Sequence, residues 1–177
     1  MSHKYKDNEI LVRDAKLEDM VHVADMIQEL ADFEKMPDGP KLSVADLQRD
    51  GFQAEPPAFM CKVAELTQPE PGQPAVVGFT IYFPTYSTWG GRAMLMEDLY
   101  VRESQRSRGV GARLFNAVAQ AAVNCNCVRV DFHVLEWNSA RVFYDAQGAE
   151  NMSQKEAWLL YRLQGEALHT SASANHK

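Results

Sequence analysis

The most informative pattern in the chain is found at residues 94–112, which read MLMEDLYVRESQRSRGVGA. An apolar strand leads into a basic turn with two glycines, and the turn opens a helix with an apolar stripe from Leu114 to Ala122. Such a turn directs several backbone N–H groups and the positive end of the helix at one point, and its glycines let a diphosphate approach closely. We therefore expect an anion site at Ser107, Arg108, Gly109, Val110, Gly111 and Ala112.

Two common phosphate motifs do not fit this turn. A P-loop would place Lys and Ser or Thr after Gly111, where the chain has Ala112 and Arg113. A dinucleotide fingerprint needs a third glycine where Leu114 stands. A glycine turn by itself is equally compatible with an ordinary connection, so the interpretation depends on the rest of the chain.

The remainder of the chain predicts a single α/β domain with a mixed sheet, because strands come in a run first and then alternate with helices. The chain has 177 residues, 46% of them apolar, which is enough to bury a core. The domain is expected to span residues 1–168, and the small polar residues 169–177 are expected to form a flexible tail. Strands are predicted at 10–12, 59–66, 75–83, 93–101, 128–134 and 158–163, with helices at 17–33, 44–50, 112–123 and 139–147. Gly90 and Gly91 predict the tip of a hairpin at 86–91, and Ser43 with Asp46 predicts the N-cap of the helix at 44–50.

Composition excludes several classes of protein. The formal charge of −6 argues against non-specific binding to nucleic acid, which depends on clustered Lys and Arg. No stretch is apolar for long enough to span a membrane. The three cysteines, Cys61, Cys125 and Cys127, lack the paired spacing of a zinc site and the even number of a disulfide framework. We therefore expect a cytoplasmic protein that binds neither metal, membrane nor nucleic acid.

Farther along the chain, Trp137-Asn138, Phe143-Tyr144 and Gly148-Ala149 extend the pattern. Together with the turn they resemble the GNAT acetyltransferase superfamily, whose signature is Arg/Gln-x-x-Gly-x-Gly/Ala followed by an Asn and a Phe-Tyr pair. The resemblance covers Ile10 to about Leu168. It implies a GNAT fold, which is a mixed, mostly antiparallel sheet with flanking helices and a splayed parallel strand pair for acetyl-CoA. It also implies acetyl transfer directly to an amine, no metal, and a homodimer.

Several segments narrow the resemblance to the diamine acetyltransferase branch, and the shared segments include Met96-Glu97-Asp98 and Glu136-Trp137-Asn138. Tyr86-Ser87-Thr88-Trp89 is closer to the thialysine Nε-acetyltransferases than to the spermidine/spermine enzymes, which carry an aspartate in place of Ser87. The chain departs from the family in one respect, since the spacing from Asn138 to Tyr144 is one residue shorter. The expected substrate is the primary amine of a small molecule, thialysine or a related lysine analogue. Polyamine acetylation, protein-lysine acetylation and a non-catalytic acyl-CoA-binding role remain alternatives.

Glu97 and Asp98 interrupt an apolar strand, and burying carboxylates without partners costs several kcal/mol per ion. Either the strand has reached solvent there, or a local bulge opens the sheet and the carboxylates receive an ammonium group. The resemblance implies the second reading, with Glu97 helping to deprotonate the amine. It further implies that the backbone of Leu99, Tyr100 and Val101 pairs with the pantetheine arm.

Tyr144 follows Phe143 on a short predicted helix, where the ordinary role of a tyrosine is packing. The resemblance implies instead that Tyr144 is the general acid toward the departing CoA thiolate. It also assigns Asn138 to the cofactor site, and the amine site to Phe33, Glu34, Glu97, Asp98, Glu156 and Trp158.

Ser87 is expected to influence the choice of amine. An aspartate there would repel the carboxylate of an amino-acid substrate by about 4 kcal/mol at about 4 Å and an effective dielectric near 20. Serine should therefore favour the amino acid over a polyamine.

Overall fold

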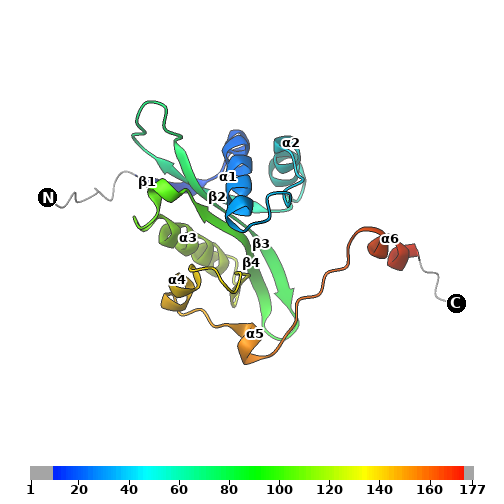
Figure 1. The fold of residues 1–177 in the computed structure, drawn as a ribbon. Helices are drawn as coiled ribbons and strands as arrows, with labels where there is room; N and C mark the ends of the chain where they lie inside the picture. Colours follow the sequence, from blue (N-terminus) through cyan, green and yellow to red (C-terminus); the bar gives the residue numbers. More distant parts are fainter. Residues whose placement is uncertain (1–9, 174–177) are drawn as a thin grey trace. The chain divides into compact units, whose positions relative to one another are not determined.

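The computed structural model describes residues 10–173, and its contacts divide the chain into two compact units, residues 1–133 and 134–177. The sheet lies entirely within the first unit (Figure 1). The first unit contains β1 (Ile10–Asp14), the 3-10 turn η2 (Leu17–Asp19), α1 (Met20–Phe33), α2 (Val44–Gln48), the π-helical turn η3 (Arg49–Gln53), β2 (Met60–Leu66), β3 (Val76–Ser87), β4 (Gly91–Val101), the 3-10 turn η4 (Glu103–Gln105), α3 (Val110–Asn124) and β5 (Val130–Phe132). The second unit contains α4 (Arg141–Ala146), α5 (Met152–Lys155) and α6 (Gly165–Ser173).

The five strands lie in the order in which they occur in the chain, β1-β2-β3-β4-β5. The first three pairings are antiparallel, whereas β4 and β5 are parallel, with Met94 opposite Val130 and Met96 opposite Phe132. A parallel pair needs a crossover, which α3 supplies. The mixed, mostly antiparallel sheet with flanking helices is therefore confirmed.

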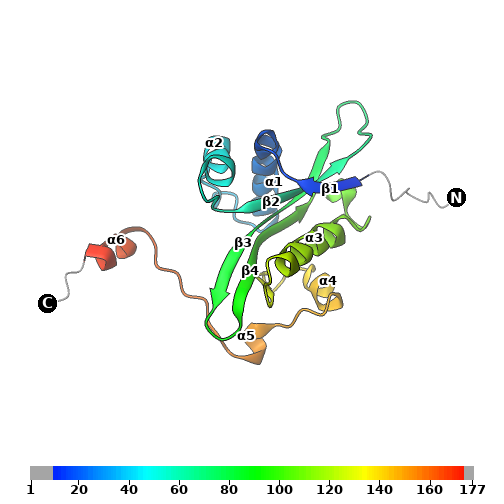
Figure 2. The ribbon, with the colours of Figure 1, turned by 180° about the vertical axis from the view of Figure 1, so that it is seen from behind.

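Helices α1 and α3 lie on opposite faces of this sheet (Figures 1 and 2). Because side chains alternate along a strand, β4 contributes Tyr100 to the core on the α1 face and Val101 to the core on the α3 face. The α1 core includes Met20, Val23, Met26, Val63 and Phe79, and the α3 core includes Ile10, Ala64, Val77, Val110 and Leu114.

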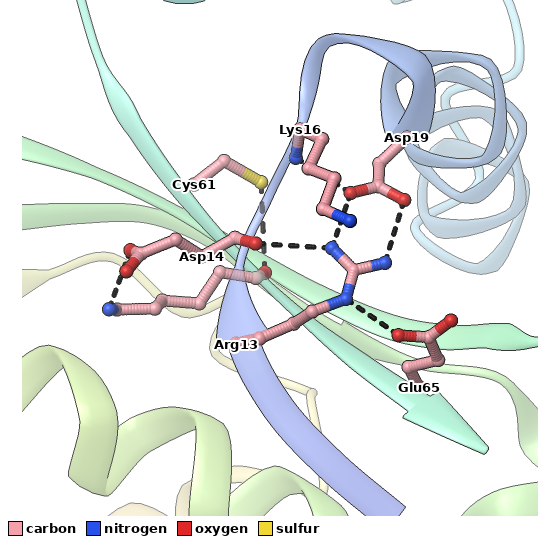
Figure 3. A network of polar contacts seen from close by, with 7 residues as sticks. Arg13, Asp14, Lys16, Asp19, Cys61 and Glu65 are labelled. Atoms are coloured by element: carbon pink, nitrogen blue, oxygen red, sulfur yellow. Dashed lines mark hydrogen bonds and ion pairs between the residues drawn. The ribbon is translucent and has the colours of Figure 1, made fainter. Parts of the chain in front are cut away.

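A polar network joins β1 and β2 to the beginning of α1 (Figure 3). Arg13 donates through Nε to Glu65 at 2.6 Å, and through Nη1 and Nη2 to Asp19 at 2.6 and 3.0 Å. Burial raises the pKa of Asp19, but hydrogen bonds from Arg13 and from the Lys16 backbone outweigh it and hold the pKa below its usual value. The network fixes the N-terminal end of α1 against the sheet and so helps to orient the opposite end, where Phe33 lies.

Two turns were predicted correctly from short-range sequence signals. The hairpin between β3 and β4 falls at the predicted glycines, with Ser87 paired to Gly91. The Ser87 hydroxyl accepts from the backbone N–H groups of Trp89 and Gly90 at 3.3 and 3.1 Å, which closes the turn. The predicted cap of α2 is also confirmed, because Ser43 and Asp46 form a reciprocal capping box.

The predicted last strand is wrong. Residues 158–163 form no strand, and no backbone hydrogen bond joins them to any other residue in the part of the chain that the structure describes. An apolar run signals burial but not a pairing partner, and a strand needs both. The large apolar side chains of this run are between 54% and 85% exposed; we call Trp158, Leu159, Leu160, Tyr161 and Leu163 the apolar run.

Helix α6 crosses the predicted boundary between domain and tail, since it extends to Ser173. Residues 174–177 of the predicted tail lie outside the described residues. The domain limits themselves remain a prediction.

The three cysteines differ in accessibility. Cys61 is buried, and burial raises the pKa of its thiol to about 12. Cys127 is half-buried and Cys125 is exposed. Among residues 10–173, no three His, Cys, Asp or Glu side chains are grouped so as to hold a metal ion. Within the same range no helix combines the length and the apolar character needed to cross a bilayer.

Candidate active site

A β-bulge interrupts the pairing of β3 and β4. Asp98 lies opposite Ile81, and Met96 lies opposite the next residue, Tyr82, so Glu97 is the extra residue of β4. The parallel pairing with β5 ends at the same point, with Met96 opposite Phe132. From Glu97 to Val101, β4 therefore pairs with β3 along one edge, while its other edge has no strand partner among the described residues. The bulge and the splay between parallel strands are both confirmed.

Three carboxylates gather beside the bulge, and we call Glu34, Glu97 and Asp98 the acidic cluster. Glu97 is exposed and Asp98 is half-buried. Burial, followed by the charges of Glu97 and Glu34, raises the pKa of Asp98 to about 6. Glu34 comes directly after α1, and burial raises its pKa as well. The cluster therefore concentrates negative charge that a bound ammonium group would neutralise.

At the other end of this stretch of β4, a turn leads into α3, and we call residues 106–112 the glycine turn. Ser107 has φ 59° and Gly109, the N-cap of α3, has φ 76°. The first N–H groups of the helix, from Val110 to Ala112, have no acceptor within the helix. A Cβ placed on Gly109 would meet no atom within 4 Å, so the space beside the turn is open. These residues fit a phosphate group, and their role toward a diphosphate remains a prediction.

The other predicted cofactor residues of β4 lie directly against this turn. A Cβ on Gly111 would come within 3.9 Å of Leu99 and 4.0 Å of Val101, so the strand and the helix N-terminus are adjacent. Tyr100 points to the opposite face, where it is buried. The residues predicted to hold the pantetheine and the diphosphate are therefore brought together by the structure, apart from those of the second unit.

The two arginines of the glycine turn have different partners. Arg108 donates through Nη1 to the side chain of Gln105, which is buried. Arg106 donates through Nε to the carbonyl of Val101 at 2.8 Å. Its guanidinium also lies 5.5 Å from the ring centre of Phe33 and 5.4 Å from that of Tyr100. The contact of Arg106 with Phe33 was not predicted from the sequence, because it joins segments that lie far apart in the chain.

The second unit holds the remaining predicted residues, and Tyr144 is the most protected of them. Its side chain is buried in α4, and its ring meets that of Phe143 edge-on, with centroids 5.1 Å apart. Burial raises the pKa of Tyr144, which keeps the phenol protonated at neutral pH. Asn138 accepts from the backbone N–H of Ala140 at 2.9 Å and so stabilises the turn before α4. A protonated phenol is the form that a general acid requires.

Glu156 and Trp158 lie beside each other within the second unit, and both are exposed. The Trp158 indole donates to the Glu156 carboxylate at 2.9 Å. Their role toward an amine, like those of Asn138 and Tyr144, remains a prediction.

Ser87 does not lie at the acidic cluster of its own chain. It pairs with Gly91, which precedes Asp98 by seven residues along β4, a distance of about 23 Å at strand rise. Charges so far apart are screened at physiological salt, where the Debye length is about 8 Å. Within one chain the expected electrostatic role of Ser87 is therefore not supported.

Comparisons with known proteins agree with this geometry. The pattern of the acetyltransferase (GNAT) family matches residues 24–149. The chain is 39% identical over 166 residues to thialysine N-epsilon-acetyltransferase of Bos taurus, which covers 92% of this chain and 97% of that protein. It is 36% identical over 159 residues to spermidine/spermine N(1)-acetyltransferase-like protein 1 of Homo sapiens, covering 89% of this chain and 23% of that protein.

A solved structure shows the same fold. The integron cassette protein from the mobile metagenome of V. cholerae matches with a TM-score of 0.72 at 23% identity, covering 94% of this chain and 99% of that one. The family pattern covers more than half of this chain, and the bovine relative covers nearly all of it. The chain therefore belongs to the GNAT family of acetyltransferases and is an N-acetyltransferase.

Proposed function

We propose that this enzyme transfers the acetyl group of acetyl-CoA to the primary amine of thialysine or of a related lysine analogue. The observation that carries the proposal is the stretch of β4 from Glu97 to Val101. It has the acidic cluster at one end, the glycine turn at the other, and between them a strand edge that has no strand partner among the described residues. The identity with the bovine thialysine enzyme supports the choice of substrate class.

The acidic cluster has two tasks in this scheme. A lysine-like ammonium has a pKa of about 10 and must lose a proton before its nitrogen can attack. Asp98, which is half-buried, and Glu34 stabilise the arriving ammonium, and the exposed Glu97 accepts its proton directly or through water.

The glycine turn and Tyr144 act at the other end of the reaction. When bound, acetyl-CoA supplies the thioester whose acetyl group is transferred. The backbone N–H groups from Val110 to Ala112 hold its diphosphate, and the free edge of β4 from Leu99 to Val101 pairs with its pantetheine arm. Tyr144 donates a proton to the leaving sulfur, which is feasible because phenol and thiol pKa values differ by only about 1.5 units.

A polyamine is the second candidate substrate. The acidic cluster supports it, because several carboxylates suit a polycation, and so does the likeness to the human spermidine/spermine N(1)-acetyltransferase-like protein.

The test measures CoA release by the purified enzyme with thialysine, spermidine, a lysine-containing peptide or no amine. We expect the highest kcat/KM with thialysine, and Glu97→Gln should lower it by roughly 10- to 100-fold. Glu70→Gln, an exposed change in the loop between β2 and β3, is the matched control and should have no effect. A higher kcat/KM for spermidine would select the polyamine function. Tight CoA binding without amine-dependent CoA release would refute the proposed function.

We also propose that the protein is a cytoplasmic homodimer. The apolar run supports a partner, because five large apolar side chains in one extended segment are costly to leave in water. Light scattering should give twice the chain mass of 19.9 kDa, and a mass of one chain would refute the dimer.

A further inference from the structure

Gln105 is a buried polar residue that comes directly before the glycine turn. It is the last residue of η4, and only 4% of its surface is exposed. Its side-chain carbonyl accepts a hydrogen bond from Nη1 of Arg108. Burying an amide is costly unless it is hydrogen-bonded, and an apolar side chain could fill the same space without that cost. The contact therefore indicates that the side chain of Gln105 serves to hold the guanidinium of Arg108.

The segment that carries Gln105 is anchored to the rest of the first unit independently of the glycine turn. The backbone N–H of Gln105 donates to the Arg102 carbonyl at 2.8 Å. The backbone N–H of Arg102 donates in turn to the Val77 carbonyl of β3 at 2.9 Å, and its Nε donates to Glu29 of α1 at 3.1 Å. Gln105 is thus attached to a residue that is bound to both the sheet and a helix, and Arg108 is bound to Gln105.

Arg108 lies where the expected phosphate site begins. It directly precedes Gly109, the N-cap of α3, and it is half-buried, so part of it faces solvent. The space beside Gly109 is open, since a Cβ there would meet no atom within 4 Å. Arg108 therefore adds a positive charge next to the N-terminus of α3, where the backbone N–H groups already favour an anion.

The chemical nature of the partner distinguishes Arg108 from other arginines of the chain. Arg13, Arg49 and Arg129 each form an ion pair with a carboxylate. A carboxylate both orients a guanidinium and cancels much of its charge, whereas the amide carbonyl of Gln105 orients the guanidinium without cancelling it. A guanidinium held in this way keeps its charge for a ligand, and its planar fork of donors matches the oxygens of a phosphate.

We propose that Gln105 is a positioning residue for acetyl-CoA, holding Arg108 so that its guanidinium binds a phosphate group of the cofactor; the inference rests on the proposed function. A free arginine side chain loses much conformational freedom when it binds a ligand. Prior immobilisation by Gln105 removes part of that cost and so raises the affinity. Because Gln105 acts through Arg108, its contribution should disappear when Arg108 is absent.

The experiment is a double-mutant cycle in which calorimetry measures the dissociation constant of CoA. Arg108→Met should weaken binding by roughly 10- to 100-fold, as expected for the loss of a hydrogen bond to a charged group. Gln105→Met, which keeps the length of the side chain, should weaken it by roughly 2- to 10-fold. In the double variant, Gln105→Met should add nothing to the effect of Arg108→Met. An equal loss in both backgrounds would show that Gln105 does not act through Arg108 and would overturn the inference.

Gln105→Glu tests whether the partner must be neutral. It keeps an acceptor for Arg108 but cancels the charge of the guanidinium, so it should weaken CoA binding at least as much as Gln105→Met while the melting temperature does not fall. Native affinity in Gln105→Glu would overturn the inference, because the charge of Arg108 would then not be used. Gln120→Met, an exposed change on α3, is the matched control and should alter neither quantity.

A second ligand identifies the phosphate. With 3′-dephospho-CoA, a loss in Arg108→Met as large as that with CoA assigns the guanidinium to the diphosphate, and a loss confined to CoA assigns it to the 3′-phosphate. Undiminished binding of both ligands by Arg108→Met would overturn the inference.

Gly109→Asp separates this inference from the proposed cofactor site. If Gly109→Asp abolishes CoA binding while Gln105→Met has no effect, the positioning role alone is wrong. If Gly109→Asp leaves the affinity unchanged, the proposed cofactor site is wrong and the inference is overturned with it.

Discussion

The glycine turn and the acidic cluster lie at opposite ends of one stretch of β4, and they are built in different ways. The turn presents backbone N–H groups, and its shape depends on residues adjacent in the chain, chiefly Ser107 and Gly109. The cluster presents side chains, and it exists because a bulge displaces Glu97 while the end of α1 brings Glu34 to Asp98. A single substitution that adds a side chain should therefore abolish the function of the glycine turn. Substitutions in the acidic cluster should each have a smaller effect, and that effect should depend on pH.

The largest effect is expected at the turn. Gly109→Asp should lower the affinity for acetyl-CoA by roughly a thousandfold or more, because a carboxylate would enter the space left for a diphosphate. Calorimetry with acetyl-CoA measures the effect. Gly72→Asp is a matched control, since Gly72 also has positive φ and open space around it but lies in a loop far along the chain. An unchanged dissociation constant for Gly109→Asp would remove the turn from the cofactor site.

Tyr144 lies outside the glycine turn and the acidic cluster, so substituting it tests whether these two regions are sufficient for the reaction. Tyr144→Phe should lower kcat by roughly a hundredfold with little change in the KM for acetyl-CoA, since a proton donor to the leaving sulfur is lost. Stopped-flow or steady-state CoA release gives both constants. Tyr161→Phe, at an exposed tyrosine of the apolar run, should change neither. Near-normal kcat in Tyr144→Phe would leave Tyr144 a packing residue.

The smallest expected effect is on the free energy of unfolding, and it arises from a substitution in the acidic cluster. The pKa of Asp98 rises on folding from 3.8 to about 6, so the folded state binds the proton more tightly. The resulting stabilisation is present below pH 4 and is lost as pH rises through 6. Asp98→Asn should therefore raise the free energy of unfolding at pH 8 by on the order of 1–2 kcal/mol and leave it unchanged at pH 4.

Urea unfolding at the two pH values measures this difference. Asp38→Asn, at an exposed position in the connection after α1, is the control and should show no pH-dependent gain. An equal effect of Asp98→Asn at both pH values would mean that burial and the neighbouring carboxylates do not raise the pKa of Asp98.

The same contrast explains what could be predicted from the sequence. The glycine turn, the hairpin at Ser87 and the cap at Ser43 were predictable because each depends on neighbours in the chain. The bulge was predictable because Glu97 and Asp98 interrupt an apolar strand, and such an interruption needs a physical reason. The contact of Arg106 with Phe33 was not predictable from the sequence, because it depends on how α1 packs on the sheet.

The apolar run shows the opposite error. Its composition is typical of a buried strand, but composition does not specify which edge a strand joins. Trp158 to Leu163 is unpaired in the described part of the chain, so the sequence indicated correctly that these side chains favour burial and incorrectly that they form a strand.

The unequal accessibility of the cysteines affects how the enzyme's turnover is recorded. CoA release is commonly followed with a disulfide reagent that reacts with any accessible free thiol and releases a coloured thiolate. Cys125 is exposed and will react at once, Cys127 is half-buried and will react more slowly, and Cys61, buried with a pKa of about 12, will stay silent until the protein unfolds. An initial rise in absorbance that scales with the enzyme concentration and not with the amine concentration therefore comes from the protein's own cysteine thiols. Only a third equivalent, from Cys61, marks unfolding and not catalysis.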